Sequence, residues 1–155
     1  MDINQLLSAL SEIIFIGQVS SLNSAEGMAT VTRSDRDNKV SAPLHVINRG
    51  SQSTKDYWMP AIDDQVLCIM LPNKNGNGYN EGFIIGSFFS TEDAPPGGAG
   101  AEARVLDTPG DMTLNVGGNL MINASGGDII VNGISLVNHV HGGVVPGGAT
   151  TSVPE

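Results

Sequence analysis

The residues that could do chemistry lie near the end of the sequence, in the segment NHVHGG from Asn138 to Gly143. This segment holds two of the chain's three histidines, His139 and His141, separated by one residue. Alternate residues of a β-strand point to the same side, so a strand through this segment would present both imidazoles on one face. Neutral imidazole is the commonest protein ligand for metals, and two of them form a bidentate clamp. The segment is therefore a candidate metal site.

One chain does not complete such a site. The third histidine, His45, lies far away in the sequence, and no Cys, Asp or Glu lies between Asp128 and Glu155. Three chains around a threefold axis would bring six imidazoles to one point, an octahedral set that suits Fe(II), Ni(II) or Co(II), whereas structural zinc prefers four ligands. A filled shell leaves no open position, so the ion would be structural rather than catalytic. The alternative is two solvent-exposed histidines in a frayed tail, but H-x-H at the end of an oligomeric repeat favours the metal.

The composition of the chain changes in the middle. All seven aromatic residues lie within the first 89 residues, whereas the rest of the chain carries thirteen of the twenty glycines and one basic residue, Arg104. The segment TEDAPPGGAGAEA at 91–103 marks the change and is rich in turn-forming residues. Two regions with different building principles are therefore predicted, joined by a linker or neck.

The first region is predicted to be all-β. Five strand-length runs, rich in β-branched and aromatic residues, alternate with turn signals: IIFIGQVSSL, GMATVTRS, KVSAPLHVI, DQVLCIML and EGFIIGSFF. Five strands in this length favour a small barrel, with the oligonucleotide/oligosaccharide-binding (OB) topology as the leading candidate. The loop NKNGNGYNEG misses the glycine spacing of a phosphate-binding loop and is expected to be a hairpin loop. A short helix is expected before the barrel, with one apolar face formed by Ile3, Leu6, Leu7 and Leu10.

The second region contains an internal repeat. Its template is Gly, then Asp or Asn, then apolar–any–apolar–Asn, and its three units are GDMTLNV from Gly110, GNLMINA from Gly118 and GDIIVNG from Gly127. Each unit reads as a short strand closed by a Gly-Gly or Asn-Gly turn, with its two apolar residues on one face. The third glycine and the spaced aspartate of the calcium-binding nonapeptide are missing, so calcium is not expected here.

Three such strands do not enclose a core within one chain. Ordering them costs about 1–2 kcal/mol per residue in backbone entropy, which one thin apolar face does not offset. The repeat is then either disordered or shares a core with other chains, and its Leu, Ile, Val and Met content argues against disorder. Three sheets are the fewest that enclose an interior, and closed cyclic symmetry is the usual solution for identical chains. The prediction is an intertwined trimeric β-fibre, in which pairing between chains also removes exposed strand edges.

Charge and motifs exclude several classes of function. The net charge of −9 argues against a nucleic-acid partner, because phosphate binding needs a basic surface. The motifs G-x-S-x-G and H-E-x-x-H, a Walker loop and a Cys–His pairing near Cys68 are absent from the sequence, so an enzyme is not expected. Cys68 lies in the apolar run VLCIMLP and is predicted to be a buried free thiol. Neither a signal peptide nor a transmembrane segment is predicted.

These features resemble a known family, the contractile-tail spike proteins. The similarity lies in WMPAIDDQVLCIMLP from Trp58 to Pro72, in EGFIIGSFFS followed by a Pro/Gly neck, and in GISLVNHVHGG after the repeats. That family includes phage baseplate assembly protein V, with the Mu-like spikes, and the related spikes of R-type bacteriocins. The resemblance covers nearly the whole chain, and the order and spacing of the motifs together make it specific. This chain has only about three repeats, so a short needle is expected.

The resemblance implies a complete architecture. The fold would be all-β, with an N-terminal OB-fold barrel followed by an intertwined trimeric β-helix (β-prism) spike and a metal-bound apex. The implied segments are a collar with a short N-terminal helix at 1–90, a Pro/Gly-rich neck at 91–109, a triple-stranded β-helix at 110–137 and an apex at 138–155. At the apex, His139 and His141 of three chains would hold one structural iron ion (Fe²⁺) per homotrimer in octahedral coordination.

The resemblance also implies a place and a role. The family spike sits at the tip of the tail tube on the central hub of the baseplate, in a virion or bacteriocin particle. Sheath contraction pushes it through the outer membrane of a Gram-negative host, so the expected partners are the hub protein and, mechanically, that membrane. One alternative stays open, a non-enzymatic trimeric module of the baseplate whose barrel binds a glycan or a receptor. It predicts an exposed aromatic platform around Tyr57, Trp58 or Tyr79, whereas packing of the barrel against its neighbour would explain Trp58 structurally.

Overall fold

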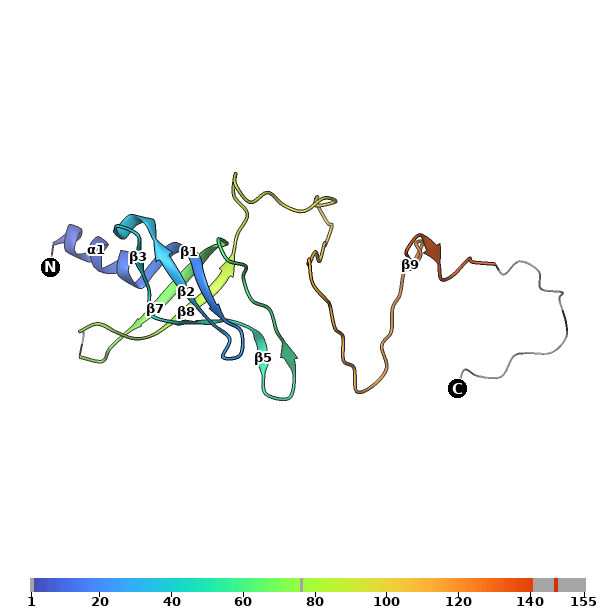
Figure 1. Ribbon diagram of the computed structural model, residues 1–155, viewed down its shortest axis with the longest axis horizontal. Helices are drawn as coiled ribbons and strands as arrows, with labels where there is room; N and C mark the ends of the chain where they lie inside the picture. Colours follow the sequence, from blue (N-terminus) through green and yellow to red (C-terminus); the bar gives the residue numbers. More distant parts are fainter. Residues whose placement is uncertain (1, 76, 141–146, 148–155) are drawn as a thin grey trace. The chain divides into compact units, whose positions relative to one another are not determined.

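A computed structural model of the chain describes residues 2–75, 77–140 and 147. Its internal contacts divide the chain into two units, Met1–Asp107 and Thr108–Glu155, and each is described by itself. The first unit carries helix α1 and strands β1 to β8, and the described part of the second carries β9 and β10 (Figure 1).

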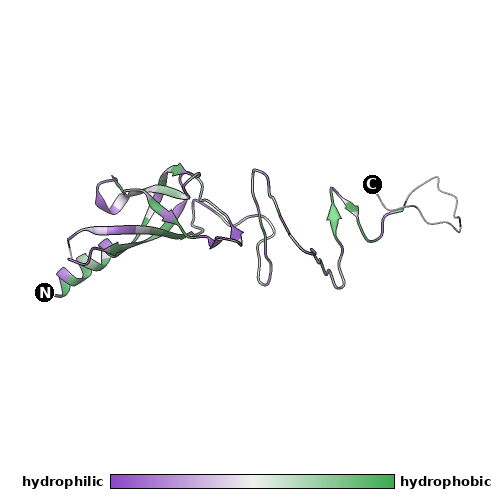
Figure 2. Cartoon of the chain, turned by 90° about the horizontal axis from the view of Figure 1, so that it is seen from below, coloured by the Kyte–Doolittle hydropathy of each residue, from purple (hydrophilic) through white to green (hydrophobic). Residues whose placement is uncertain are grey.

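Helix α1 (Ile3–Ile13) forms where the apolar residues recur at helical spacing. Asp2 caps it, because its carboxylate accepts a hydrogen bond from the backbone N–H of Gln5 at 2.8 Å, while the Gln5 side chain accepts one from the N–H of Asp2 at 3.0 Å. The helix gives way to extended backbone at Ile14, where β1 begins. Its apolar face is left uncovered (Figure 2), and the exposed residues on it are Ile3, Leu6, Leu7 and Leu10.

Five strands of the first unit close into a barrel. In order around it they are β1 (Ile14–Asn23), β7 (Gln65–Pro72), β8 (Tyr79–Ser87), β4 (Leu44–Val46) and β2 (Met28–Arg33). Pairing of β2 with β1 closes the ring, and every neighbouring pair is antiparallel except β4 with β8, which is parallel. The five-stranded barrel and the all-β class predicted from the sequence are confirmed.

The barrel interior follows from the period-2 burial of its strands. In β2, alternate residues are buried, as expected for strands with one face on a core. The fully or nearly buried apolar side chains are Phe15, Val19, Ala29, Val31, Leu44, Val46, Val66, Cys68 and Ile84. Cys68 is free and buried, as predicted. Its burial raises the pKa of the thiol to about 12.

The third predicted strand run, KVSAPLHVI, gives two short strands, β3 (Lys39–Val40) and β4. Pro43 lies between them and has no N–H to donate to a ladder. Ser41 instead links the segment to β2: its N–H donates to the Val31 carbonyl at 2.8 Å, and its Oγ accepts the Val31 N–H at 3.0 Å. The sequence pattern gave no sign of this interruption beyond the proline itself.

A hairpin that was not predicted follows β4. It consists of β5 (Arg49–Ser51) and β6 (Lys55–Asp56), in the stretch where the sequence indicated only a turn. Gly50 lies at an irregularity in its register with φ of 81°, and a Cβ there would collide with the Thr54 carbonyl. Glycine is therefore required at this bulge.

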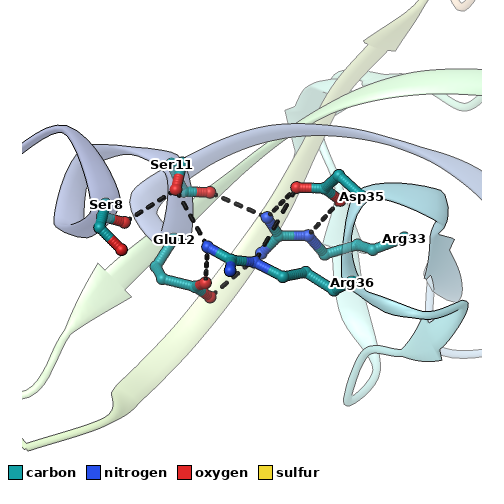
Figure 3. A network of polar contacts seen from close by, with 6 residues as sticks. All are labelled: Ser8, Ser11, Glu12, Arg33, Asp35 and Arg36. Atoms are coloured by element: carbon teal, nitrogen blue, oxygen red, sulfur yellow. Dashed lines mark hydrogen bonds and ion pairs between the residues drawn. The ribbon is translucent and has the colours of Figure 1, made fainter. Parts of the chain in front are cut away.

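A buried cation joins α1 to the barrel (Figure 3). Arg33, only 6% exposed, lies 4.1 Å from the centroid of the Phe15 ring. Its guanidinium donates to Glu12 at 3.1 Å, to the Ser11 carbonyl at 3.0 Å and to Asp35 at 2.8 and 3.1 Å. The hydrogen bond from Arg33 holds the pKa of Asp35 below its usual value. Two of these acceptors belong to the last turn of α1, so the network fixes the helix to the barrel.

The sheet formed by β1, β7 and β8 is apolar on its outer side as well. The register places Ile14 opposite Ile69 and Ile16 opposite Leu67, while the intervening Phe15 points inward. Ile14 and Ile16 are 51% and 56% exposed. A strand face that is apolar and uncovered is a surface that other molecules can cover.

The second unit has little regular structure in the single chain. Among its described residues the strands are β9 (Ile130–Val131) and β10 (Ile134–Ser135), both in or just after the third repeat. The first two repeats, at 110–124, form no strand here. Their apolar side chains are exposed, as Leu114 at 64% and Ile122 at 61% illustrate. The trimeric β-helix remains a prediction, because its strands would pair between chains.

Candidate metal-binding apex

His139 follows the β9–β10 hairpin closely. Residues 136–138 form a turn after β10, and the exposed His139 comes directly after them. In the single chain, the strand that would continue through NHVHGG thus ends at Ser135. His141 lies outside the described residues. The placement of both imidazoles on one strand face stays a prediction.

The hairpin that precedes His139 is set by its turn. Asn132 and Gly133 have φ values of 50° and 80°, and two successive positive values are the mark of a type I′ turn. This turn matches the twist of the strands it joins, and it pairs Val131 with Ile134 and, one step further out, Ile130 with Ser135.

Asp128 connects the two sides of the hairpin. Its Oδ1 accepts hydrogen bonds from the backbone N–H groups of Ile129 at 2.7 Å and Val137 at 3.3 Å. The Ser135 side chain also bonds to Asp128, and this bond is the main reason why the pKa of Asp128 lies below its usual value. Desolvation of the carboxyl, the second-largest effect, raises the pKa, and the two backbone donors lower it. Asp128 is therefore an ionised acceptor at neutral pH.

Ser135 has a second role at the same place. Its Oγ accepts the backbone N–H of Asn138 at 2.7 Å, so one hydroxyl ties Asn138 to Asp128. In the sequence, Asp128 stood out only as a member of the repeat template. The Asn132–Gly133 signal could have found this contact, because a two-residue turn there places residue 128 opposite residue 137.

The donor set of one chain is incomplete in the described region. Among residues 2–75, 77–140 and 147, no group of three or more His, Cys, Asp or Glu side chains could hold a metal ion. Asp128 is already engaged with three hydrogen-bond donors. What the chain offers is the H-x-H pair, whose imidazole donors suit a first-row divalent ion if further ligands come from other chains. The described residues alone hold no complete site, and the chemistry of the H-x-H pair fits a metal that is shared between chains.

His45 belongs to the barrel and not to the apex unit. It lies on β4 and stacks on Phe83 of β8, with ring centroids 5.6 Å apart and an interplanar angle of 29°. This packing explains the third histidine structurally.

The three aromatic residues of the alternative binding platform do not gather in one place. Tyr57 donates from its hydroxyl to the Ser24 carbonyl at 3.3 Å, beyond the end of β1. Tyr79 is paired with Pro72, near the start of β1 at the opposite end of the barrel. Trp58 packs against the barrel core and donates from its indole N–H to the Ile47 carbonyl at 2.9 Å. Tyr79 thus lies apart from Tyr57 and Trp58, and the binding module stays an untested alternative.

Among the described residues, no helix combines the length and the apolar character needed to cross a lipid bilayer.

A comparison with known families bears on the segment that carries the H-x-H pair. Residues 133–155 match the GpV Apex motif. The match supports a gpV-like phage baseplate spike protein, as the resemblance in the sequence implied. In GpV this motif is the metal-binding apex region, and spikes of this family are structural proteins of the virion. No curated protein matches the chain.

Proposed function

We propose that this protein is the central spike at the tip of a contractile tail and that it pierces the host outer membrane when the sheath contracts. The observation that carries the proposal is the match of residues 133–155 to the GpV Apex motif, which begins inside the β9–β10 hairpin and includes both histidines. The role is mechanical, since the tip must resist force while it is driven forward. The parent particle is a phage or an R-type bacteriocin.

The working form in this proposal is a homotrimer. The exposed apolar residues of the repeats support it, because side chains such as Leu120 and Ile122, 57% and 61% exposed in one chain, gain a core only between chains. The outer face of β1, β7 and β8 supplies a second apolar surface for the same contacts. The barrel is assigned to the OB fold on its closed five-stranded order with one parallel pair. Residues 110–137 then form the triple-stranded β-helix and 138–155 the apex.

His139 and His141 of the three chains hold one iron ion in this proposal. An ion held there would cross-link the three chains and would serve a structural rather than a catalytic role. The chain's own contribution is to bring the two imidazoles of each copy to the axis and to close the end of the fibre, which would otherwise fray. His139 stands at the end of a hydrogen-bonded hairpin, which suits that task.

The metal proposal is tested by measuring metal content per chain in untagged protein by mass spectrometry, together with the mass of the assembly in solution. About one iron per three chains in a trimer is expected, because only a shared site gives that ratio. The double variant His139→Ala with His141→Ala should stay trimeric and lose the metal, while His45→Ala, in the barrel, should keep it. Metal retained by the double variant would refute the ligand assignment.

The hub of the baseplate is the second proposed partner, and α1 is the element we assign to it. The register of the barrel places α1 where β7 ends and β8 begins, whereas the chain leaves β8 at Ser87, beside Val66 at the other end of the barrel (Figure 1). Helix α1 therefore lies at the end of the barrel opposite to the end where β8 stops, and we assign the end with α1 to the hub. The uncovered apolar stripe of a short helix is a common docking element for a groove on a partner.

This assignment is tested with Leu7→Ser combined with Leu10→Ser. The variant should trimerise normally and fail to join tail particles, because the stripe is lost while the Arg33 network at the other end of the helix is kept. Asn4→Ser, on the same helix but outside the stripe, is the matched control. Loss of the trimer in the double variant would instead place α1 between copies of the spike.

A further inference from the structure

The backbone immediately before His139 is held in an unusual way. Three consecutive N–H groups each have a defined acceptor: Leu136 donates to the Ile129 carbonyl at 2.9 Å, Val137 to Asp128 Oδ1 at 3.3 Å and Asn138 to Ser135 Oγ at 2.7 Å. Two of the three acceptors are side chains. The direction in which the chain reaches His139 is therefore set by specific residues as well as by the strand ladder.

The two side-chain acceptors are themselves connected. Ser135 accepts from Asn138 and also bonds to the Asp128 carboxylate, so the three groups form a chain of hydrogen bonds from Asn138 through Ser135 to Asp128. In such a chain each bond polarises the next. These donors lower the pKa of Asp128, and the Ser135 hydroxyl has the largest effect.

This arrangement is confined to the third repeat. Asp111 occupies the same template position in the first repeat, and Asn119 does so in the second, yet no strand forms at either place in the single chain. Within the described part of residues 108–155, β9 and β10 are the one strand pair. The segment before His139 is thus held by hydrogen bonds within one chain. The first two repeats form no strand pair in the described single chain, and in the proposed trimer they would pair with other chains.

We propose that Asp128 and Ser135 are positioning residues for the apex metal. They fix the backbone leading to His139 within each chain, so that the approach to this residue is set before three chains meet. The inference rests on the proposed metal site and adds the residues that support it. The physical reason is that residues outside the ligand set usually orient metal ligands, and that a preformed geometry spares the ordering cost at the moment of binding.

The test compares Asp128→Ala and Ser135→Ala with three controls in the full-length protein. Asp128→Asn keeps an oxygen that can accept the same N–H groups and should rescue. Asp111→Ala removes the equivalent aspartate of the first repeat, and His139→Ala removes a proposed ligand. For each variant, the fraction of trimer, the metal remaining after timed exposure to EDTA and the hydrogen exchange of the Val137 and Asn138 amides are measured.

The expected result is specific to the positioning pair. Asp128→Ala and Ser135→Ala should remain trimeric, exchange these two amides faster and lose metal about 10–100 times faster than the wild type, the range typical for residues that support ligands. Asp128→Asn and Asp111→Ala should behave like the wild type. His139→Ala should lose the metal altogether.

Three results would overturn the inference, and they differ from a failure of the metal site itself. Wild-type rates of metal loss and amide exchange in Asp128→Ala would show that the pair positions nothing. Loss of the trimer in that variant would show a role in assembly instead. Failure of Asp128→Asn to rescue would show that charge matters and not the hydrogen bonds. A wild-type protein without metal would remove the proposed site, and this inference together with it.

Discussion

The two units of this chain solve the problem of folding in opposite ways. Residues 1–107 bury their apolar strand faces against one another inside a closed barrel, and side chains such as Leu44 and Ile84 are wholly inaccessible. Residues 108–155 have a comparable supply of Leu, Ile, Val and Met, yet most of those that the structure describes are exposed in one chain. The difference lies in the length of strand between turns. The three repeats, of eight or nine residues each, enclose no core among the described residues of one chain, and we propose that the second unit finds its core in other copies.

Separating the two units should have the largest effect. A fragment of residues 1–107 should fold and unfold cooperatively as a monomer or weak oligomer, because its core is internal. A fragment of residues 108–155 should show no cooperative transition at low concentration and should gain structure only as concentration rises. Circular dichroism across a concentration series measures both. A monomeric 108–155 fragment with a sharp transition would contradict the shared core.

Charges introduced into one repeat should abolish assembly. Leu120 and Ile122 share a face of the second repeat, and Leu120→Asp with Ile122→Asp would place carboxylates in the proposed interior, where no partner awaits them. Met121→Asp carries a charge in the same repeat at the position of the opposite face and should be tolerated. Analytical ultracentrifugation compares the two. Equal trimer content in both variants would argue against a β-helix in which Leu120 and Ile122 face the interior.

A cavity in the barrel should be costly and local. Leu44 is fully buried, so Leu44→Ala should lower the free energy of unfolding of the barrel by about 2–5 kcal/mol. Leu120→Ala, in the second unit, should leave the barrel transition where it is. Chemical denaturation followed by the fluorescence of Trp58, which packs against the barrel core, reports on the barrel alone. A cost below 1 kcal/mol at Leu44 would mean that the core relaxes around the cavity.

Loosening the attachment of α1 should cost less. Arg33→Met removes the bonds to Glu12 and Asp35 while keeping an apolar stem over Phe15, and about 1–2 kcal/mol is expected because both carboxylates are partly exposed and regain water. The pKa of Asp35 is lowered by Arg33, so its contribution is present above the ordinary aspartate pKa, near 3.9, and is lost as the pH falls through the depressed value. The wild type should therefore approach the variant in stability only in strong acid. If the difference in stability between wild type and variant stays the same in strong acid, packing and not the ion pair with Asp35 would explain it.

The smallest effect is expected at Cys68. Burial raises the pKa of its thiol to about 12, so the reactive thiolate is scarce at pH 8 and the side chain is inaccessible. Native protein should not react with a disulfide reagent over hours, whereas protein unfolded in guanidinium should react fully. Rapid reaction of the native form would mean that the barrel opens more readily than its packing indicates.

The features that the sequence predicted correctly are those that leave a repeating local pattern of residues. Strand runs with β-branched and aromatic residues predicted the barrel, because alternate burial leaves a period-2 trace in β2 and its neighbours. Helical spacing predicted α1 with its apolar stripe, and the apolar run around Cys68 predicted its burial. The order of motifs ending in NHVHGG pointed to the spike family, which the GpV Apex match supports.

The tertiary structure decided what depends on contacts between distant residues. Local patterns did not reveal the parallel pairing of β4 with β8, the placement of Arg33 between α1 and Phe15, or the β5–β6 hairpin. The hydrogen bond between the Val137 N–H and Asp128 also depends on tertiary structure. It forms only because the turn at Asn132–Gly133 brings together two residues that are nine apart in the sequence. Periodicity in a sequence records which face of a strand is buried; which partner buries it is fixed only when the chain, or several chains, close around a common core.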